Sequence, residues 1–274
     1  MIDFVSSLLR HNDLEHGHYA EPYAGGCGLA LSLLYGGHVS EIHINDIDPA
    51  VWAFWYCVLS DTQALADLIL NTPVTIDEWI KQRDIYREHS SDFLRLGFSA
   101  FFLNRTNRSG IIKGAGVIGG IKQNGNFKMD CRYNKDDLIR RVFRVKKYAD
   151  RIHLSCLDAQ DFMKKVNTRL PRKSLLFIDP PYFKKGADLY TSYYKPNDHA
   201  QIAKTVERIS LPWIVTYDDV QEIRDVYLRN QQYAFDISYS VREKRLGSEL
   251  LITSNKIRLP MGHLKHFVEQ HVSP

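Results

Sequence analysis

The chain has 274 residues, of which 44% are hydrophobic and 25% charged, with a formal net charge of +4, as in ordinary soluble globular proteins. No apolar run approaches the roughly 20 residues that cross a bilayer, and no basic-then-apolar secretory pattern opens the sequence, so we expect a cytoplasmic protein without a membrane partner. The cysteines form no close pair, and we expect neither disulfides nor a metal site. We expect the scattered histidines to be solvated rather than metal-bound, among them His16, His18, His263, His266 and His271.

The first fifty residues alternate helix and strand patterns. After a helical opening at residues 4–9, the chain runs from Tyr19 to Tyr23 into Gly25-Gly26-Cys27-Gly28, which a helix-like stretch at 29–35 follows. Apolar and polar residues then alternate at 41–45, as in a strand. This order of strand, glycine turn, helix and strand predicts a parallel α/β sheet with right-handed crossovers.

The middle of the chain is different in character and strongly basic. Residues 51–95 are mostly helical in pattern, residues 105–133 contain six glycines, and residues 136–148 predict a basic helix. Asn124-Gly125 predicts a type I′ β-hairpin. Residues 101–151 carry thirteen Lys or Arg against four Asp, a net +9 that leaves −5 for the rest of the chain. Such a segment is typical of a surface that neutralises phosphates.

Strand and helix patterns resume after residue 150. Strands are predicted at 151–154, 174–178, 213–217, 234–241 and 249–253, with a helix at 199–209. The last two strands follow each other closely, so we expect an antiparallel hairpin at the far edge of the sheet. We therefore predict a discontinuous α/β domain of residues 1–60 and 151–260, an insert at 61–150 and a C-terminal tail at 261–274.

The most informative motif is Asp179-Pro180-Pro181-Tyr182, directly after the apolar run 175–178. A buried strand that ends in a carboxylate, two prolines and an aromatic ring offers a charge, an unpaired carbonyl and a ring edge to a ligand. This combination suits a planar amine. The alternative is a Pro-Pro turn that only ends the strand and leaves Asp179 solvated.

The glycine turn and Asp46 together suggest a cofactor that contains a nucleoside. Glycines let a ligand approach backbone N–H groups, and a carboxylate at the end of the next strand can bind both ribose hydroxyls. Asp46 lies eighteen residues after Gly28, a fitting distance. Asp46 could equally cap a helix that begins near Pro49. The residues do not decide between a dinucleotide and S-adenosylmethionine, although Gly-Gly-Cys-Gly lacks the spacing of a pyrophosphate-binding loop.

Several motifs occur in one order along the chain: Glu21-Pro22-Tyr23-Ala24-Gly25-Gly26, Asn45-Asp46-Ile47-Asp48, Leu103-Asn104-Arg105 with Ser109-Gly110, Arg132-Tyr133, and Asp179-Pro180-Pro181-Tyr182. From about Tyr19 to Ser254 the chain resembles the D12 (Dam-like) class of adenine-specific DNA N6-methyltransferases. The resemblance implies a Rossmann-like class I S-adenosylmethionine-dependent methyltransferase sheet with a late antiparallel hairpin. It also implies that the insert is a helical and β-hairpin DNA-recognition subdomain.

The resemblance implies a role for each matching residue. The cofactor S-adenosyl-L-methionine would contact Tyr23, Ala24, Gly25, Gly26, Gly28, Asp46, Ile47, Leu157, Asp158 and Asp179. The catalytic residues would be Asp179, Pro180, Pro181 and Tyr182. Our candidates for contact with double-stranded DNA are Arg105, Asn107, Arg108, Lys122, Arg132 and Tyr133. For Arg105, Asn107 and Arg108, which have side chains suited to base or backbone contact, the alternative is a solvated loop.

The implied activity is methylation of N6 of a flipped adenine in a specific DNA sequence. A cognate restriction endonuclease is a candidate partner. One departure from the family pattern is at the start, where Met1 is followed by Ile2-Asp3-Phe4-Val5 instead of an aromatic, glycine and lysine motif. A second hypothesis is therefore a DNA-binding protein that keeps the fold with impaired catalysis. A third is an adenine N6-methyltransferase that acts on RNA.

Overall fold

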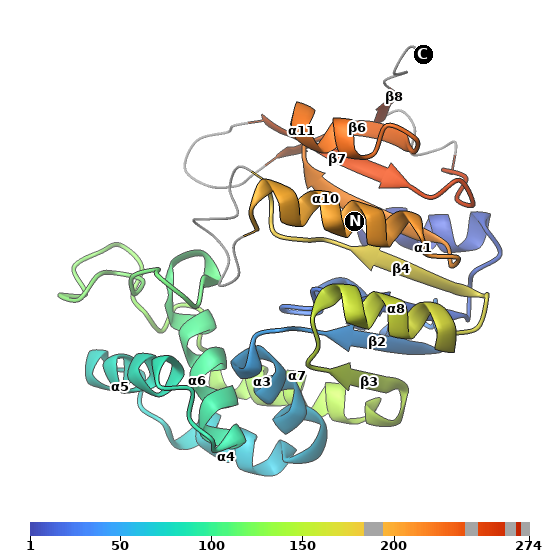
Figure 1. Ribbon diagram of the computed structural model, residues 1–274. Coiled ribbons are helices and arrows are strands. Elements are labelled where there is room, and N and C mark those ends of the chain that lie inside the picture. Colours follow the sequence, from blue (N-terminus) through green and yellow to red (C-terminus); the bar gives the residue numbers. More distant parts are fainter. Residues whose placement is uncertain (184–193, 239–245, 261–266, 270–274) are drawn as a thin grey trace. The chain divides into compact units, whose positions relative to one another are not determined.

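The computed structural model describes residues 1–183, 194–238, 246–260 and 267–269 (Figure 1). The described chain forms two compact units, one of Met1–Asn45 with the part from Leu157 onward, the other of Asp46–Cys156. Among the described residues, no helix has the length and apolar character needed to cross a membrane.

The first unit contains a mixed, mainly parallel sheet. Its strands are β1 (His18–Glu21), β2 (Glu41–Asn45), β4 (Ser174–Ile178), β5 (Trp213–Asp218), β6 (Gln231–Ser238), β7 (Leu246–Thr253) and β8 (Phe267–Glu269). They lie in the order β2-β1-β4-β5-β7-β6-β8. The pairs from β2 to β5 are parallel, and those from β5 to β8 are antiparallel.

The late hairpin is confirmed, but its predicted place is wrong. Strands β6 and β7 pair antiparallel along their whole length. However, β8 pairs with β6, so β6 is not the edge of the sheet. The predicted tail 261–274 therefore includes a strand, and its residues 261–266 and 270–274 lie outside the described chain.

Helices of the first unit bury the apolar faces of these strands. They are α1 (Ile2–His11), α2 (Gly28–Tyr35), α8 (Ala159–Arg169), α10 (Pro196–Glu207) and α11 (Gln221–Val226). Figure 1 shows α8 and α10 along one face of the sheet, where Phe162 and Val166 of α8 join Ile202 and Val206 of α10 in the core. The spacing of these apolar side chains by three or four residues explains why both segments are helices.

The second unit is mostly helical. It contains α3 (Pro49–Ser60), α4 (Thr62–Asn71), α5 (Ile76–Arg87), α6 (Phe93–Thr106), α7 (Lys135–Lys146), the short 3₁₀ helices η1 (Arg108–Gly110) and η2 (Ala149–Arg151), and strand β3 (Ile152–Ser155). The predicted basic helix is α7, whose buried side chains Leu138, Val142 and Val145 leave the charged side chains outside.

Helix α3 belongs to the second unit, whereas we predicted a boundary at residue 60. It packs closely along α6, and Phe54 stacks on Phe101 with ring centroids 5.5 Å apart. A Cβ added to Gly97 of α6 would lie 2.6 Å from the carbonyl carbon of Ala53, so only glycine permits this approach. The boundary therefore falls at the end of β2, after Asn45.

The β-hairpin predicted at Asn124-Gly125 is wrong. Residues 105–133 are all described, and they contain no strand, only an isolated bridge from Asn107 to Val117. The Gln123 side chain organises the loop, since its amide nitrogen donates to the carbonyl of Ile118 and its amide oxygen accepts from the N–H of Met129. These local bonds replace the ladder that a hairpin would form.

Candidate active site

Two loops follow the carboxyl ends of neighbouring strands in the first unit's sheet. Strands β1 and β4 run parallel, with Tyr19 opposite Leu175 and Ala20 opposite Leu176. The glycine turn follows β1, and Asp179 follows β4. The strand after β1 is β2, which lies on one side of the β1–β4 pair, and the strand after β4 is β5, which lies on the other side. The carboxyl ends of β1 and β4 therefore form a topological switch point, where open α/β sheets bind their ligands. The sheet thus brings the two strongest sequence motifs together.

The glycine turn leaves open space beside its backbone. The N–H of Ala24 donates to the carbonyl of Asn45 at 2.8 Å, which holds the turn against the end of β2. Cys27, at the start of α2, has the left-handed φ of 49°. An added Cβ would meet no atom within 4 Å at Gly25, Gly26 or Gly28. A ligand can therefore approach this backbone closely.

Asn45 fixes the base of the turn, a role that sequence reasoning missed. Its side chain is fully buried, and its amide nitrogen donates to the carbonyls of Pro22 and Leu157, both at 3.0 Å. Its amide oxygen accepts from the N–H of Leu157 at 2.9 Å. Both segments that we predicted to contact the cofactor, at 23–28 and 157–158, are thus tied to one residue.

Glu21 is a buried carboxyl group beneath the glycine turn. The Tyr19 hydroxyl donates to Oε1 of Glu21 at 2.9 Å. Burial raises the pKa of Glu21 to about 8, with a smaller contribution from the charge of Asp179. Glu21 is therefore mostly protonated at neutral pH, which leaves Asp179 as the charged member of the two.

The carboxylate of Asp179 is held from β5. The hydroxyl of Thr216 donates to Oδ1 of Asp179 at 2.7 Å. Burial raises the pKa of Asp179 to about 6, the hydrogen bond from Thr216 lowers it, and the nearby Glu249 raises it. Asp179 is only half-buried, so one side of it stays accessible. At neutral pH it is mainly an ionised acceptor in a poorly solvated place, rather than a solvated turn residue.

Two further contacts fix the segment after Asp179. The Tyr182 hydroxyl donates to Oε1 of Glu249 at 2.8 Å, and the N–H of Phe183 donates to Oδ1 of Asp218 at 2.8 Å. Asp218 and Glu249 are opposite each other on β5 and β7. Strands β5 and β7 therefore set the direction of the Tyr182 ring. Sequence reasoning missed these partners, because Glu249 lies 67 residues after Tyr182 and Asp218 lies 35 residues after Phe183.

The Asp179–Thr216 hydrogen bond leads to a prediction on pH dependence. Thr216→Val keeps the shape of the side chain but removes the donor, so the pKa of Asp179 should rise above about 6. If a reaction at this site needs the ionised carboxylate of Asp179, the acid limb of the kcat/KM profile of the variant should move to higher pH. Thr205→Val, which removes a hydrogen bond to Gln160, is the matched control. A profile equal to that of the wild type would exclude this role for Thr216.

The remaining predicted cofactor residues have varied surroundings. The Tyr23 hydroxyl lies 3.3 Å from that of Tyr194, and the two rings meet edge-on. Leu157 is half-buried, whereas Asp158 is exposed and caps α8 by accepting from the N–H of Gln160 at 2.9 Å. In the structure, Asp158 is therefore the N-cap of α8.

Asp46 and Ile47 belong to the second unit, directly after β2. Asp46 Oδ1 accepts from the N–H of Asp48 at 2.9 Å, and Ile47 is 48% exposed. The cap of α3 is Asp48, which accepts from the N–H of Ala50 and from the hydroxyl of Tyr86. The capping role that the sequence allowed for Asp46 therefore falls to Asp48.

Cationic side chains gather where α6 ends in the second unit. Arg105 is half-buried, and burial together with the positive charges of Arg132 and Arg141 lowers its pKa. Arg108 and Lys122 are exposed on the following loop. Like charges held together in this way favour the binding of an anion.

Three predicted DNA contacts serve the loop itself. Asn107 is buried, where its side-chain oxygen accepts from the Trp79 indole at 2.7 Å and its nitrogen donates to the carbonyl of Ile111. Tyr133 is buried against the aromatic rings of α6. Arg132 donates to the carbonyls of Asn104 and Asn107. The structure therefore gives the Asn107 amide a role in holding the loop.

One of three comparisons with known proteins, a scan against family models, agrees with the sequence motifs. The family model of D12 class N6 adenine-specific DNA methyltransferases matches residues 2–243. A search of curated proteins found no match. Among solved structures, a conserved hypothetical protein of Streptococcus pyogenes matches with 12% identity, 93% of this chain and 91% of that chain covered, and a TM-score of 0.31.

A protein from Legionella pneumophila str. Philadelphia 1 matches with 13% identity, 96% of this chain and 85% of that chain covered, and a TM-score of 0.36. The family match covers strands β1, β2, β4, β5 and β6 and both loops of the candidate site. The chain belongs to the D12 class of N6 adenine-specific DNA methyltransferases.

Proposed function

We propose that the protein transfers a methyl group from S-adenosylmethionine to N6 of an adenine flipped out of a specific site in double-stranded DNA. The family supports methyl transfer to adenine in DNA. The proposal of a methyl donor and a flipped adenine at this site depends on the pairing of β1 with β4. This pairing brings the open glycine turn close to the carboxylate of Asp179.

The glycine turn fits the cofactor. The space beside Gly25, Gly26 and Gly28 would admit the methionine part, and the adjacent Tyr23 offers a ring to it. Asp46 and Ile47 stay our predicted contacts for the ribose and the adenine. When bound, S-adenosylmethionine supplies an electrophilic methyl group on a sulfonium.

Asp179 and Pro180 would act on the amino group of the target adenine. The lone pair of N6 is delocalised into the ring, so this nitrogen is a poor nucleophile. The Asp179 carboxylate and the Pro180 carbonyl can each accept one N6 hydrogen, which favours a pyramidal nitrogen with its lone pair free. After transfer, the extra proton on N6 can leave to Asp179, whose pKa of about 6 suits a temporary acceptor. Electrostatic placement contributes a few kcal/mol, and orientation about 7 to 11 kcal/mol.

Tyr182 would stack on the flipped base. An adenine within the duplex cannot reach a strand-end carboxylate, and extruding it costs roughly a few kcal/mol. The hydrogen bond to Glu249 holds the Tyr182 ring in one orientation before the base arrives. A fixed ring loses little conformational entropy when it binds the base, which partly offsets the cost of extrusion.

The second unit would supply the contacts to the DNA backbone. Arg105 and Arg108 are our candidates for phosphate or base contacts, and Lys122 for phosphate. Beside Lys122, Ile121 is 60% and Phe127 72% exposed. Large apolar side chains on a basic loop suit contact with unstacked bases.

Binding of the cofactor tests this proposal. Isothermal titration with S-adenosylmethionine should show one site per chain, and Gly26→Leu should weaken it at least about tenfold because the new side chain fills the space beside the turn. Gly116→Leu is the matched control, since its added Cβ also meets no atom within 4 Å. No binding to the wild type at millimolar cofactor would favour the DNA-binding protein without turnover. Structured RNA that displaces duplex DNA would favour the RNA enzyme.

A further inference from the structure

Two histidines and a glutamate converge at the start of strands β1 and β2. In the parallel register His18 is opposite Glu41, and Ala20 is opposite His43. Because alternate residues of a strand share a face, His18, Glu41 and His43 all project from one face of the sheet. Nδ1 of His18 lies 3.0 Å from Nε2 of His43 and 3.8 Å from Oε2 of Glu41.

The three side chains present the right atoms for a metal ion. One ligand atom from each lies within 4.8 Å of the others. Tetrahedral Zn²⁺ with bonds of about 2.0 to 2.2 Å needs ligand atoms roughly 3.3 Å apart. The two imidazole rings are nearly parallel, with centroids 5.2 Å apart and an interplanar angle of 13°. To hold one ion, the rings must turn so that the contact between their nitrogens is replaced by a bond from each nitrogen to the ion.

We propose that His18, Glu41 and His43 bind one divalent transition-metal ion of the Zn²⁺, Co²⁺ or Ni²⁺ type. Imidazole nitrogen favours these ions over Mg²⁺ and Ca²⁺, which prefer oxygen ligands only. The His18 and Glu41 side chains are 22% and 36% exposed, so an ion can enter from solvent. Three protein ligands leave the fourth position to water.

The site is separate from the proposed active site. His18 is the first residue of β1, while the glycine turn follows Glu21 at the other end of that strand. At about 3.3 Å per residue, roughly 10 Å of strand separates His18 from Glu21. The ion would join β1 to β2 and stabilise the fold, and it would not take part in methyl transfer.

We expected His18 to be solvated rather than metal-bound. Its partner Glu41 belongs to the next strand, and only the parallel register brings the two together. A spacing rule that looks along the chain misses ligands that meet across a sheet.

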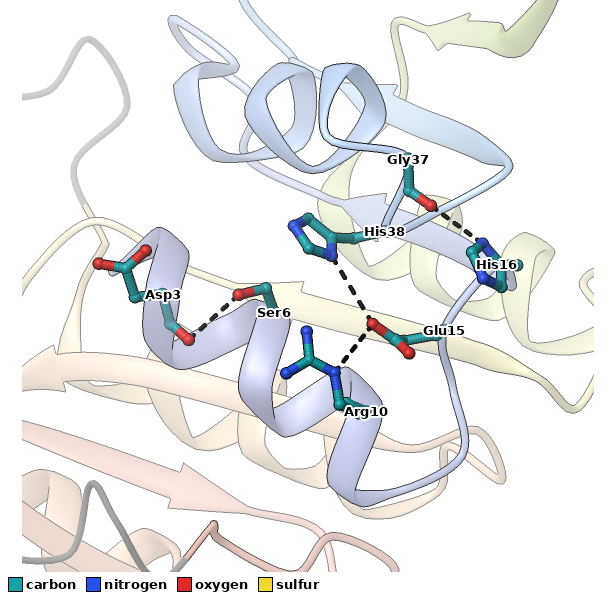
Figure 2. A network of polar contacts seen from close by, with 7 residues as sticks. All are labelled: Asp3, Ser6, Arg10, Glu15, His16, Gly37 and His38. Atoms are coloured by element: carbon teal, nitrogen blue, oxygen red, sulfur yellow. Dashed lines mark hydrogen bonds and ion pairs between the residues drawn. The ribbon is translucent and has the colours of Figure 1, made fainter.

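A second histidine cluster in the same unit provides a matched control. As Figure 2 shows, Nδ1 of His16 is bonded to the carbonyl of Gly37 at 3.0 Å, and Glu15 lies 3.3 Å from Arg10 and 3.8 Å from His38. The guanidinium competes with an ion for Glu15, and the ring of His16 is turned to the backbone. This cluster should not bind the ion.

Titration of the untagged full chain with Co²⁺ after chelation tests the proposal. Wild type should bind one ion with the visible absorption of a tetrahedral site, lose it to Zn²⁺, and gain thermal stability. His43→Ala and Glu41→Gln should each weaken the affinity at least tenfold, and His38→Ala should not. Circular dichroism checks the fold, and His18→Gln, which keeps a polar side chain, replaces any variant that fails to fold. No binding below millimolar Co²⁺, equal binding by these variants, or loss in His38→Ala would overturn the assignment.

Discussion

Asp179→Ala is expected to lower methyl transfer to adenine by at least about 1,000-fold while the protein stays folded and still binds DNA. The variant loses both the acceptor for an N6 hydrogen and the group that can take up the released proton. The hydrogen bond from Thr216 is lost with the carboxylate, but the hydrogen bond from Tyr182 to Glu249, which holds the same loop, remains in place. Single-turnover methylation with saturating cofactor measures the loss directly, and fluorescence anisotropy measures DNA binding.

The stability of Asp179→Ala provides a control. Burial raises the pKa of Asp179 from 3.8 to about 6 in the folded state, so the stability linked to this group is full below pH 3.8 and is lost as pH rises through about 6. The variant, which has no such group, should therefore gain in thermal stability relative to the wild type as pH rises from 4 to 8. Turnover close to that of the wild type would remove Asp179 from the mechanism.

Replacing Arg105 and Arg108 together with alanine is expected to weaken DNA binding and to reduce its salt dependence. If both residues neutralise phosphates, the slope of log K against log salt should become shallower by about 1.8, because each contact to B-DNA contributes about 0.9. Arg132 and Arg141 add positive charge near Arg105, which favours the binding of an anion there. Filter binding between 50 and 200 mM salt provides the slope.

The matched control removes two positive charges from the first unit. Arg10 and Lys164 are exposed and each is paired with a carboxylate, Glu15 and Asp161. Their double alanine variant changes the net charge equally, so its slope should stay close to that of the wild type. An equal loss in both double variants would show a general charge effect, and an unchanged slope for Arg105 and Arg108 would exclude them from the interface.

Local patterns in the sequence predicted much of the sheet. Strands β2 and β4 were found with their observed bounds, because alternation in 41–45 and an apolar run at 174–178 report burial directly. The same patterns located the two loops at strand ends. The residues that hold those loops, Asn45, Thr216 and Glu249, were not found, since each contact joins segments distant in sequence and depends on strand order.

In the insert, by contrast, a local sequence pattern led to a wrong prediction. Asn124-Gly125 is typical of a two-residue hairpin turn, but such a turn needs strands on both sides. Instead, the Gln123 amide nitrogen donates to the carbonyls of Ile118 and Gly120, and no strand forms in the described residues 107–134. Likewise, Asn107 has a side chain suited to reading adenine, but its burial beneath Trp79 could not be foreseen from its neighbours.

The most direct test of the central claim is nucleoside analysis of methylated DNA. Unmethylated plasmid is incubated with the purified protein and S-adenosylmethionine carrying a deuterated methyl group, digested to nucleosides and examined by mass spectrometry. We predict labelled N6-methyldeoxyadenosine at a repeated sequence with the wild type and none with Asp179→Ala. Label on cytosine, label on RNA alone, or equal label from the two proteins would contradict the account.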